Sequence, residues 1–209
     1  MHRQTIGITA FDKHWFHIVN GWTQISPVLN DLGKVLAKFA PEIWLVVFVV
    51  LWFWPPRVQS QTRKAVVYAV VAGVLALVIN VIIGHFYYRP RPFVYEPLLV
   101  HQLLQHKPDT SFPSDHAAGS FAFAVGLFYA SKKREGIFGL IFAATIAVAR
   151  VFVGLHWPTD VLAGATIGVI SGLIVLALRR QLEWLVNLGY AIFRIRPERS
   201  RYRSRMRMD

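Results

Sequence analysis

Hydrophobic residues are grouped along the chain in five long stretches, separated by shorter polar segments. Each stretch has the apolar character of a helix that lies within a bilayer. Together they predict an all-α fold, a polytopic transmembrane helical bundle. The stretches cover residues 41–54, 65–86, 114–130, 137–153 and 159–178.

The first stretch is short for a membrane-spanning helix. At a rise of 1.5 Å per residue, residues 41–54 cover roughly 21 Å, against a hydrocarbon core of about 30 Å. We therefore expect either that residues before Pro41 extend this helix or that the bilayer is locally thinner.

The segment before the first stretch has a different pattern. Apolar residues between positions 18 and 39 recur at steps of three and four, and polar residues fill the other face. This spacing predicts N-terminal amphipathic helices with a break near Ser26 and Pro27, where Ser can cap a helix and Pro can begin one. We interpret the segment as lying in the membrane interface. A sixth span with a polar face is the alternative.

Basic residues are concentrated in the connections that alternation places on one side of the bundle. The connection between the first two stretches and the one between the third and fourth each contain three, and nine arginines follow the fifth. Cytoplasmic connections are rich in Lys and Arg, so this side is predicted to be cytoplasmic. The remaining connections, residues 87–113 and 154–158, then share the outer face of the membrane.

Composition fits a single membrane domain. Of the 209 residues, 55% are hydrophobic and 16% are charged, whereas soluble domains carry about 25% charged residues. We divide the chain into an amphipathic segment (1–40), a transmembrane core (41–178) and a basic cytoplasmic tail (179–209). The absence of cysteine excludes disulfides, thiol catalysis and cysteine-metal sites.

The net charge of +12 raises the question of nucleic-acid binding, but its distribution indicates otherwise. Half of the excess lies in the tail, where nine arginines face three acidic residues. A basic tail after a span fits a solvated segment or a contact with anionic headgroups better than a nucleic-acid site. Membrane lipids are the expected partners.

Polar and charged residues gather on the predicted outer face. Guanidinium groups bind phosphate oxygens in a bidentate manner, and a helix N-terminus adds N–H donors. Two histidines can divide nucleophilic and acid–base work, and a nearby carboxylate can fix an imidazole tautomer. An arginine inside an apolar stretch is itself a functional hypothesis. The set comprises Arg89, Arg91, Ser114, His116, Arg150, His156 and Asp160.

Other chemistries fit the residues less well. Zinc requires a compact set of ligands, and the spacing of His85, His101 and His106 matches none, so we expect no metal. Ser114 with His116 as base lacks an oxyanion arrangement for acyl transfer. No glycine-rich nucleotide loop is present in the sequence.

These residues resemble the type 2 phosphatidic acid phosphatase superfamily, whose signature is K-x6-R-P, then P-S-x-H, then S-R-x5-H-x3-D. The chain has Arg91-Pro92, Pro113-Ser114-Asp115-His116, and Arg150-x5-His156-x3-Asp160, within residues 65–178. It departs from the signature at two positions. Gly84 stands where the family has lysine, and Ala149 where it has serine, and either Arg89 or His85 is a candidate replacement for the lysine.

Within the superfamily, the R-P-R-P-F run and the P-S-D-H form are most similar to bacterial undecaprenyl-diphosphate phosphatases of the bacitracin-resistance type. The resemblance implies hydrolysis of undecaprenyl diphosphate, a polyprenyl diphosphate lipid, on the outer membrane face, in support of cell-wall synthesis and without a cofactor. Residue roles follow the family. His156 is the nucleophile oriented by Asp160, His116 the acid and base, and Arg89, Arg91, Ser114 and Arg150 the phosphate ligands.

Two other functions remain open at this point. The first is a phosphatase of the same family that acts on phosphatidylglycerophosphate, phosphatidate or lipid A, since the motifs do not separate these substrates. The second is a lipid or anion transporter in which the arginines only bind the headgroup. A transporter would carry polar residues along several spans, whereas here the polar set is confined to one face.

Overall fold

The computed structural model of the chain describes residues 4–53, 60–129 and 134–193. These residues are mostly helical with almost no strand, which confirms the predicted all-α fold class. The helices are α1 (Ala10–Gly21), the 3-10 helix η1 (Trp22–Gln24), α2 (Pro27–Phe53), α3 (Ser60–Phe86), α4 (Pro92–Tyr95), α5 (Asp115–Leu127), α6 (Arg134–Phe152), α7 (Pro158–Ala177) and α8 (Glu183–Ile192). Two short strands, β1 (Gln4–Thr5) and β2 (Tyr87–Tyr88), form a parallel pair.

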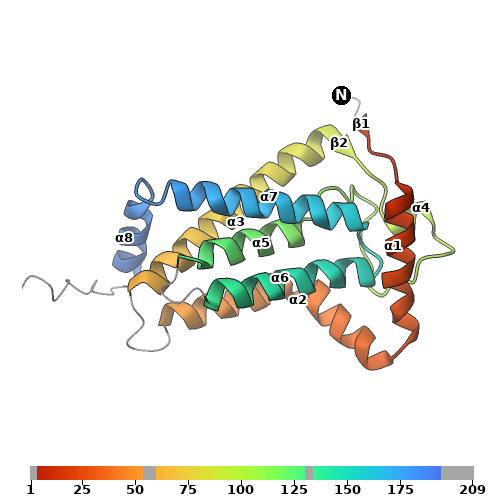
Figure 1. The fold of residues 1–209 in the computed structure, drawn as a ribbon, viewed down its shortest axis with the longest axis horizontal. Coiled ribbons are helices and arrows are strands. Elements are labelled where there is room, and N and C mark those ends of the chain that lie inside the picture. Colours follow the sequence, from red (N-terminus) through yellow and green to blue (C-terminus); the bar gives the residue numbers. More distant parts are fainter. Residues whose placement is uncertain (1–3, 54–59, 130–133, 194–209) are drawn as a thin grey trace, which may run out of the picture.

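The long helices form a bundle, with α1 lying across one of its ends (Figure 1). Helix α5 packs against α3, α6 and α7. Close packing is possible because small residues face each other, as is usual between helices in membranes. A Cβ atom added at Gly164 of α7 would lie 2.4 Å from the carbonyl oxygen of Ser114, and one at Gly168 would lie 2.3 Å from that of Ala118.

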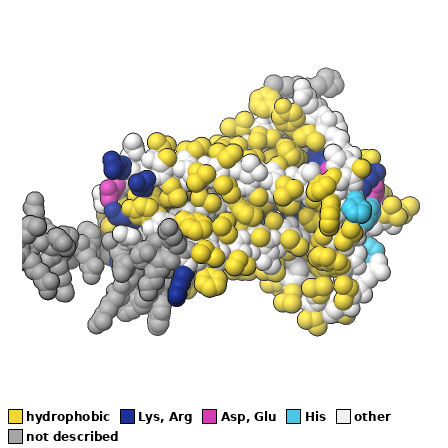
Figure 2. All heavy atoms as spheres, in the orientation of Figure 1, with side chains coloured by type: hydrophobic (Ala, Val, Ile, Leu, Met, Phe, Trp, Pro, Cys, Tyr) yellow, Lys and Arg dark blue, Asp and Glu magenta, His cyan; other side chains and the backbone are white. Residues whose placement is uncertain are grey.

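Three of the described helices are long and apolar enough to cross a membrane: α2, α3 and α7. The apolar part of α6 is shorter (Gly136–Phe152), and α5 has only 13 residues, most of them buried. Hydrophobic side chains cover the flank of the bundle between its two ends (Figure 2). Of the five predicted stretches, the third therefore forms a short inner helix enclosed by the others.

Helix α2 corrects one prediction and confirms another. It runs without interruption from Pro27 to Phe53 with Pro41 inside it, so residues 27–40 are not a separate helix, and their place in the membrane interface stays a prediction. They extend the helix of the first stretch, which was one of the two expectations for it, and the predicted break before Pro27 is present. Figure 1 shows that α2 is bent, and a proline inside a helix is the usual cause of a bend.

The two ends of the bundle have different character. The described parts of the basic connections contain Arg63, Lys64 and Arg134, and they lie at the end near α8. The basic residues predicted in 54–59, 130–133 and 194–209 lie outside the described residues. Part of the predicted tail is folded, because α8 buries Val186 and Tyr190 against the core. The opposite end, beneath α1, holds the candidate site.

Candidate active site

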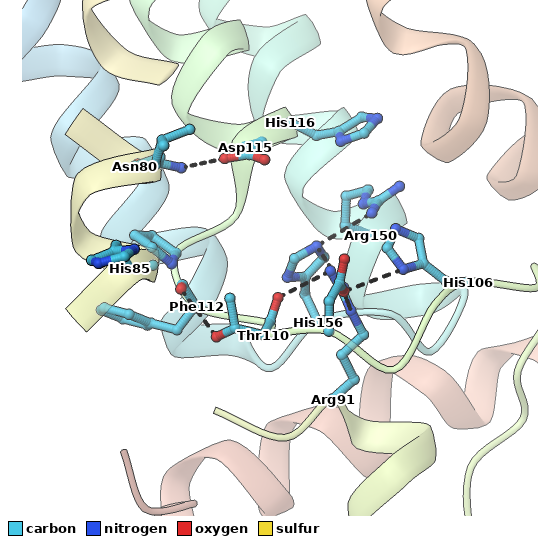
Figure 3. Close-up of a pocket in the computed structure, with 14 residues that line it drawn as sticks. Asn80, His85, Arg91, His106, Thr110, Phe112, Asp115, His116, Arg150 and His156 are labelled. Carbon is cyan, nitrogen blue, oxygen red and sulfur yellow. Dashed lines mark hydrogen bonds and ion pairs between the residues drawn. The ribbon is translucent and has the colours of Figure 1, made fainter. Parts of the chain in front are cut away.

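A cavity of about 490 Å³ opens at the end of the bundle near α1 (Figure 3). Four of the seven predicted site residues line it: Arg91, His116, Arg150 and His156. They come from all three motifs of the predicted set, which the fold brings to one cavity. The remaining predicted residues, Arg89, Ser114 and Asp160, are buried and do not line the cavity.

Local structure explains how these side chains reach the cavity. His116 is the second residue of α5, and Arg150 lies in the last turn of α6. Gly154 then adopts a φ of +83°, a left-handed conformation that favours glycine. This turn brings His156 back beside Arg150 before α7 begins at Pro158.

His156 is held between a carbonyl group and two guanidinium groups. Its Nδ1 lies 2.8 Å from the carbonyl oxygen of Ser111, which can only accept, so Nδ1 carries the proton. Its Nε2 lies 3.3 Å from Nη1 of Arg91 and 3.3 Å from Nη2 of Arg150. Burial, together with the charges of Arg150 and Arg91, lowers the pKa of His156 to about 4. At neutral pH the ring is therefore uncharged, with the lone pair of Nε2 available.

Arg91 is fixed mainly by backbone carbonyl groups. Nη1 donates to the carbonyl oxygen of Leu155 at 3.0 Å, and Nη2 donates to that of Thr110 at 3.1 Å. Nε forms an ion pair with Asp109 at 2.8 Å. The carbonyl groups do not neutralise the guanidinium, and Asp109 is 55% exposed, so solvent screens its charge and part of the charge of Arg91 remains available to an anion in the cavity.

Arg150 is fixed by a carbonyl group of α2. Its Nη1 donates to the oxygen of Ala37 at 2.8 Å. In a regular helix this oxygen would accept the N–H four residues later, but that residue is Pro41, which has none. The bend in α2 therefore exposes an acceptor for a buried arginine. No carboxylate contacts this guanidinium within 4 Å among the described residues.

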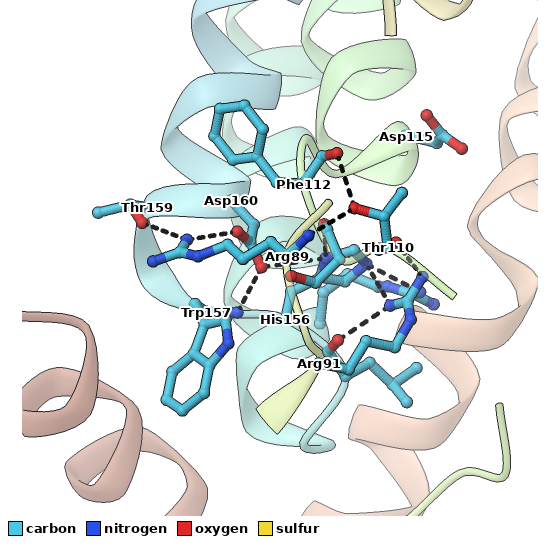
Figure 4. Close-up of polar contacts among 12 residues, drawn as sticks. Arg89, Arg91, Thr110, Phe112, Asp115, His156, Trp157, Thr159 and Asp160 are labelled. Carbon is cyan, nitrogen blue, oxygen red and sulfur yellow. Dashed lines mark hydrogen bonds and ion pairs between the residues drawn. The ribbon is translucent and has the colours of Figure 1, made fainter. Parts of the chain in front are cut away.

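The position of Arg89 corrects its predicted role as a phosphate ligand. Its side chain is only 1% exposed and lies behind Asp160 (Figure 4). Nη1 contacts Asp160 Oδ1 at 2.5 Å, and Nη2 contacts Asp12 Oδ2 at 2.5 Å. A guanidinium that is shared by two carboxylates has little charge left for a third anion.

Asp160 and Ser114 lie behind the cavity wall. Asp160 Oδ2 accepts the backbone N–H of Trp157 at 2.8 Å and lies 3.6 Å from His156 Nδ1, too far for a direct hydrogen bond. The Ser111 carbonyl, rather than Asp160, is thus the close partner of the imidazole. The Ser114 hydroxyl has no hydrogen-bond partner among the described residues, and its role as a phosphate ligand stays a prediction.

Several residues around the site were missed by the sequence analysis. Asp12 and Thr159 contact Arg89, and the carbonyl groups of Ser111 and Ala37 hold His156 and Arg150. Backbone acceptors leave no trace in the side-chain pattern. Asp12 did have a local signal, because Thr9 and Asp12 form a capping box at the start of α1, but that signal indicates a helix end and not a distant partner.

The structure also places the two departures from the family signature. Ala149 is buried in an apolar cluster with Ala37 and Phe152. Gly84 lines the cavity, and a Cβ atom there would meet Thr110 at an ordinary 3.6 Å. Arg89 does not replace the missing lysine, because its guanidinium is engaged elsewhere. His85 lines the cavity next to Gly84, and so does His106. Among the described residues, no group of three or more His, Asp or Glu side chains is arranged to hold a metal ion.

Comparisons with known proteins bear on the family and the fold of the chain. Residues 64–184 match the PAP2 superfamily. The chain is 31% identical to undecaprenyl-diphosphatase BcrC of Bacillus subtilis over 85% of its own length and 89% of the relative. It is 34% identical to a Bacillus licheniformis protein named bacitracin transport permease protein BcrC, over 70% and 75% of the two chains. The crystal structure of Aquifex aeolicus LpxE superposes with a TM-score of 0.69 at 25% identity, over 83% of this chain and 99% of the other.

Proposed function

The chain belongs to the PAP2 superfamily and is a membrane lipid phosphatase, and from this membership we propose that it hydrolyses undecaprenyl diphosphate to undecaprenyl phosphate and inorganic phosphate. One observation carries the proposal. The uncharged Nε2 of His156 faces a cavity between two guanidinium groups, and a second histidine, His116, lines the same cavity.

The proposed reaction begins with substrate binding. Arg91 and Arg150 bind the terminal phosphate and stabilise the charge that develops on its oxygens. The Nε2 lone pair of His156 then attacks phosphorus, so that a P–N bond forms while the bond from phosphorus to the bridging oxygen breaks. Asp160, 3.6 Å from Nδ1, stabilises the positive ring of the phosphohistidine.

His116 serves both half-reactions. The negative charge of the bound diphosphate favours the protonated form of His116, and this form gives a proton to the bridging oxygen as the lipid monophosphate leaves. It then accepts a proton from water, whose oxygen attacks phosphorus and breaks the P–N bond. Inorganic phosphate leaves and His156 returns to its starting form. The two histidines suit these separate roles because they lie on different elements, α5 and the connection between α6 and α7.

A lipid substrate fits the surroundings of the cavity. Val81, on the outer surface of α3, lines the cavity and is 70% exposed on a helix long enough to span the bilayer. A prenyl chain can therefore remain among apolar side chains while its diphosphate reaches the arginines. Because the basic connections lie at the opposite end of the bundle, the positive-inside rule supports a cavity on the outer face of a bacterial cell membrane.

Phosphate release by purified protein in detergent tests the proposal. Undecaprenyl diphosphate, phosphatidylglycerophosphate, phosphatidate and lipid A are compared, with a chelator present, for wild type and His156→Ala. We expect chelator-resistant release from the prenyl diphosphate that the variant lacks. Brief incubation with substrate labelled in the terminal phosphate should leave an acid-labile label on wild type only.

Other results would replace parts of the proposal. Preference for a glycerolipid or lipid A would keep the mechanism and change the substrate. If the folded His156→Ala variant turned over substrate as fast as wild type, the proposed phosphohistidine intermediate would be wrong. Folded wild type that releases phosphate from none of these lipids would favour the transporter alternative, in which the arginines only bind the headgroup.

A further inference from the structure

We propose that Asp12, in the N-terminal helix α1, is a positioning residue of this active site that acts through Arg89 and Asp160 on His156. The inference rests on the proposed function, because it assigns a role in that reaction. Asp12 lies outside residues 64–184, which match the superfamily, and outside all three motifs of the signature.

Asp12 binds two parts of the site at once. Its side chain is fully buried. Oδ1 accepts the backbone N–H of Thr159 at 3.0 Å and the Thr159 hydroxyl at 2.7 Å. Since Thr159 lies in the first turn of α7, the carboxylate occupies the helix N-terminus, where a negative charge is most favourable. Oδ2 contacts Nη2 of Arg89 at 2.5 Å.

Arg89 connects Asp12 to Asp160. Its Nη1 contacts Asp160 Oδ1 at 2.5 Å and the Thr159 hydroxyl at 2.6 Å (Figure 4). Its Nη2 also donates to the carbonyl oxygen of Gly7 at 3.2 Å. The pairing of β1 with β2 brings the segment that contains Gly7 beside Arg89. Both nitrogens at the end of the guanidinium are therefore engaged.

This chain of contacts ends at the candidate nucleophile. Asp160 accepts the N–H of Trp157, the residue after His156, and its Oδ2 is 3.6 Å from His156 Nδ1. One arginine between two carboxylates gives the group a net charge of −1. That charge favours the positive ring of a phosphohistidine. Without the charge of Asp12, Arg89 would neutralise Asp160 alone and the net charge would be zero.

A role in stability alone does not account for this arrangement. Buried ion pairs contribute little net stability, because the cost of desolvating both charges offsets their attraction. Helix α1 also has other attachments. Phe16 packs against Trp157, the Asn20 side chain donates to the carbonyl oxygen of Phe152 at 2.8 Å, and Lys13 pairs with Glu96. The buried charges of Asp12 and Arg89 are therefore better explained by their effect on the position and the charge of Asp160.

The test compares Asp12→Asn with Thr9→Ala in the full-length protein. Thr9 caps α1 and contacts Asp12, but among the described residues it forms no hydrogen bond with Arg89 or Thr159. We expect Asp12→Asn to lower kcat for the preferred lipid by roughly 10- to 100-fold, the range typical of partners behind an active-site histidine. KM should stay within about twofold because Arg91 and Arg150 are untouched. Thr9→Ala should retain kcat.

A second readout does not depend on turnover. In the 15N-histidine spectrum at pH 7, the signals that His156→Gln removes identify His156. Solvent exchange of its Nδ1 proton should be about 10-fold faster in Asp12→Asn, because the group that orders the ring and Asp160 is loosened. Thr9→Ala should leave this rate unchanged. If wild type hydrolysed no lipid, the proposed function would fail and this measurement would still decide the role of Asp12.

Unchanged kcat and unchanged exchange in folded Asp12→Asn would overturn the inference. So would an equal loss in Thr9→Ala, because that result would reduce Asp12 to an anchor of α1. If Asp12→Asn does not fold, Thr159→Val replaces it. This variant removes the hydroxyl shared by Asp12 and Arg89 at nearly constant volume. A several-fold loss of kcat supports the inference, and full activity with unchanged exchange refutes it.

Discussion

Arg150 donates from Nη1 to the carbonyl oxygen of Ala37 at 2.8 Å, and Pro41, four residues along α2 from Ala37, has no N–H to offer that oxygen. The carbonyl group that Pro41 leaves without a helical donor is thus the acceptor that Arg150 uses. An interior proline leaves a buried carbonyl group without a partner. A buried guanidinium requires acceptors that leave its charge free for a phosphate.

Replacing Pro41 with alanine should separate stability from activity. The new N–H would bond to Ala37 and straighten α2, which stabilises the helix by up to about 3 kcal/mol. Arg150 would then share or lose its acceptor, and we expect kcat to fall roughly threefold to tenfold. Thermal unfolding in detergent and steady-state kinetics measure the two effects. Pro27→Ala, at the first position of the same helix, is the control, and a Pro41→Ala protein with full kcat would disprove the coupling.

The ring of His156 should remain neutral at pH values well below 6.5, the ordinary pKa of histidine. Its pKa is lowered from 6.5 to about 4 by burial and the neighbouring arginines, so the unfolded chain takes up this proton first on acidification. The contribution of His156 to stability is therefore complete above pH 6.5 and is lost as the pH falls toward 4. Titration of the 15N signals assigned with His156→Gln checks this, and a midpoint near 6.5 would contradict it.

Asp109 should compete with the substrate for Arg91. Its carboxylate pairs with Nε of Arg91 at the cavity, and its side chain is 55% exposed. The two carbonyl acceptors of Arg91 remain in Asp109→Asn, so the guanidinium should keep its position. We expect inorganic phosphate to inhibit this variant at roughly two- to fivefold lower concentration, as removal of one exposed charge allows.

Competition by phosphate against the lipid substrate measures that change. Asp31→Asn is a suitable control because Asp31 pairs with Lys34 on the surface of α2, away from the cavity. Weaker inhibition of Asp109→Asn by phosphate would show that Asp109 orients Arg91 and does not compete with the ligand.

The contact between α5 and α7 should tolerate no side chain at Gly164. A Cβ atom there would lie 2.4 Å from the Ser114 carbonyl oxygen, so the start of α5 must shift. We expect Gly164→Ala to lower the free energy of unfolding by about 1–3 kcal/mol and to reduce kcat, because His116 follows Ser114 by two residues. Gly7→Ala, which meets nothing within 4 Å, should be neutral. The free energy of unfolding and kcat, measured for both variants, test this prediction.

The sequence was sufficient to predict that the side chains lining the cavity lie on one face. His116, Arg150 and His156 lie at the ends of apolar stretches, and helices of alternating direction must bring those ends to one face. Arg91 lies at the same face and lines the same cavity. These predictions depend only on the period and order of the helices, and both can be read from hydrophobicity.

The sequence was not sufficient for Arg89, because its role depends on a carboxylate 77 positions away. Asp12 appears locally as a helix-capping residue, and no spacing rule relates α1 to the turn before α7. The predicted start of the first stretch at Pro41 was wrong for a related reason. Proline normally ends a helix, and the acceptor it frees is satisfied by Arg150, which is remote in the chain.

The residues that match the superfamily, 64–184, contain both histidines and all three arginines of the site. The atoms that hold two of those arginines are not among them, since Asp12 binds Arg89 and Ala37 binds Arg150. The motif region is therefore not an interchangeable module. A chimera that joined this region to an N-terminal segment without a carboxylate at position 12 and a proline at position 41 would keep every motif side chain and lose the acceptors that fix them, so a crossover should preserve activity only when these acceptors accompany the motif region.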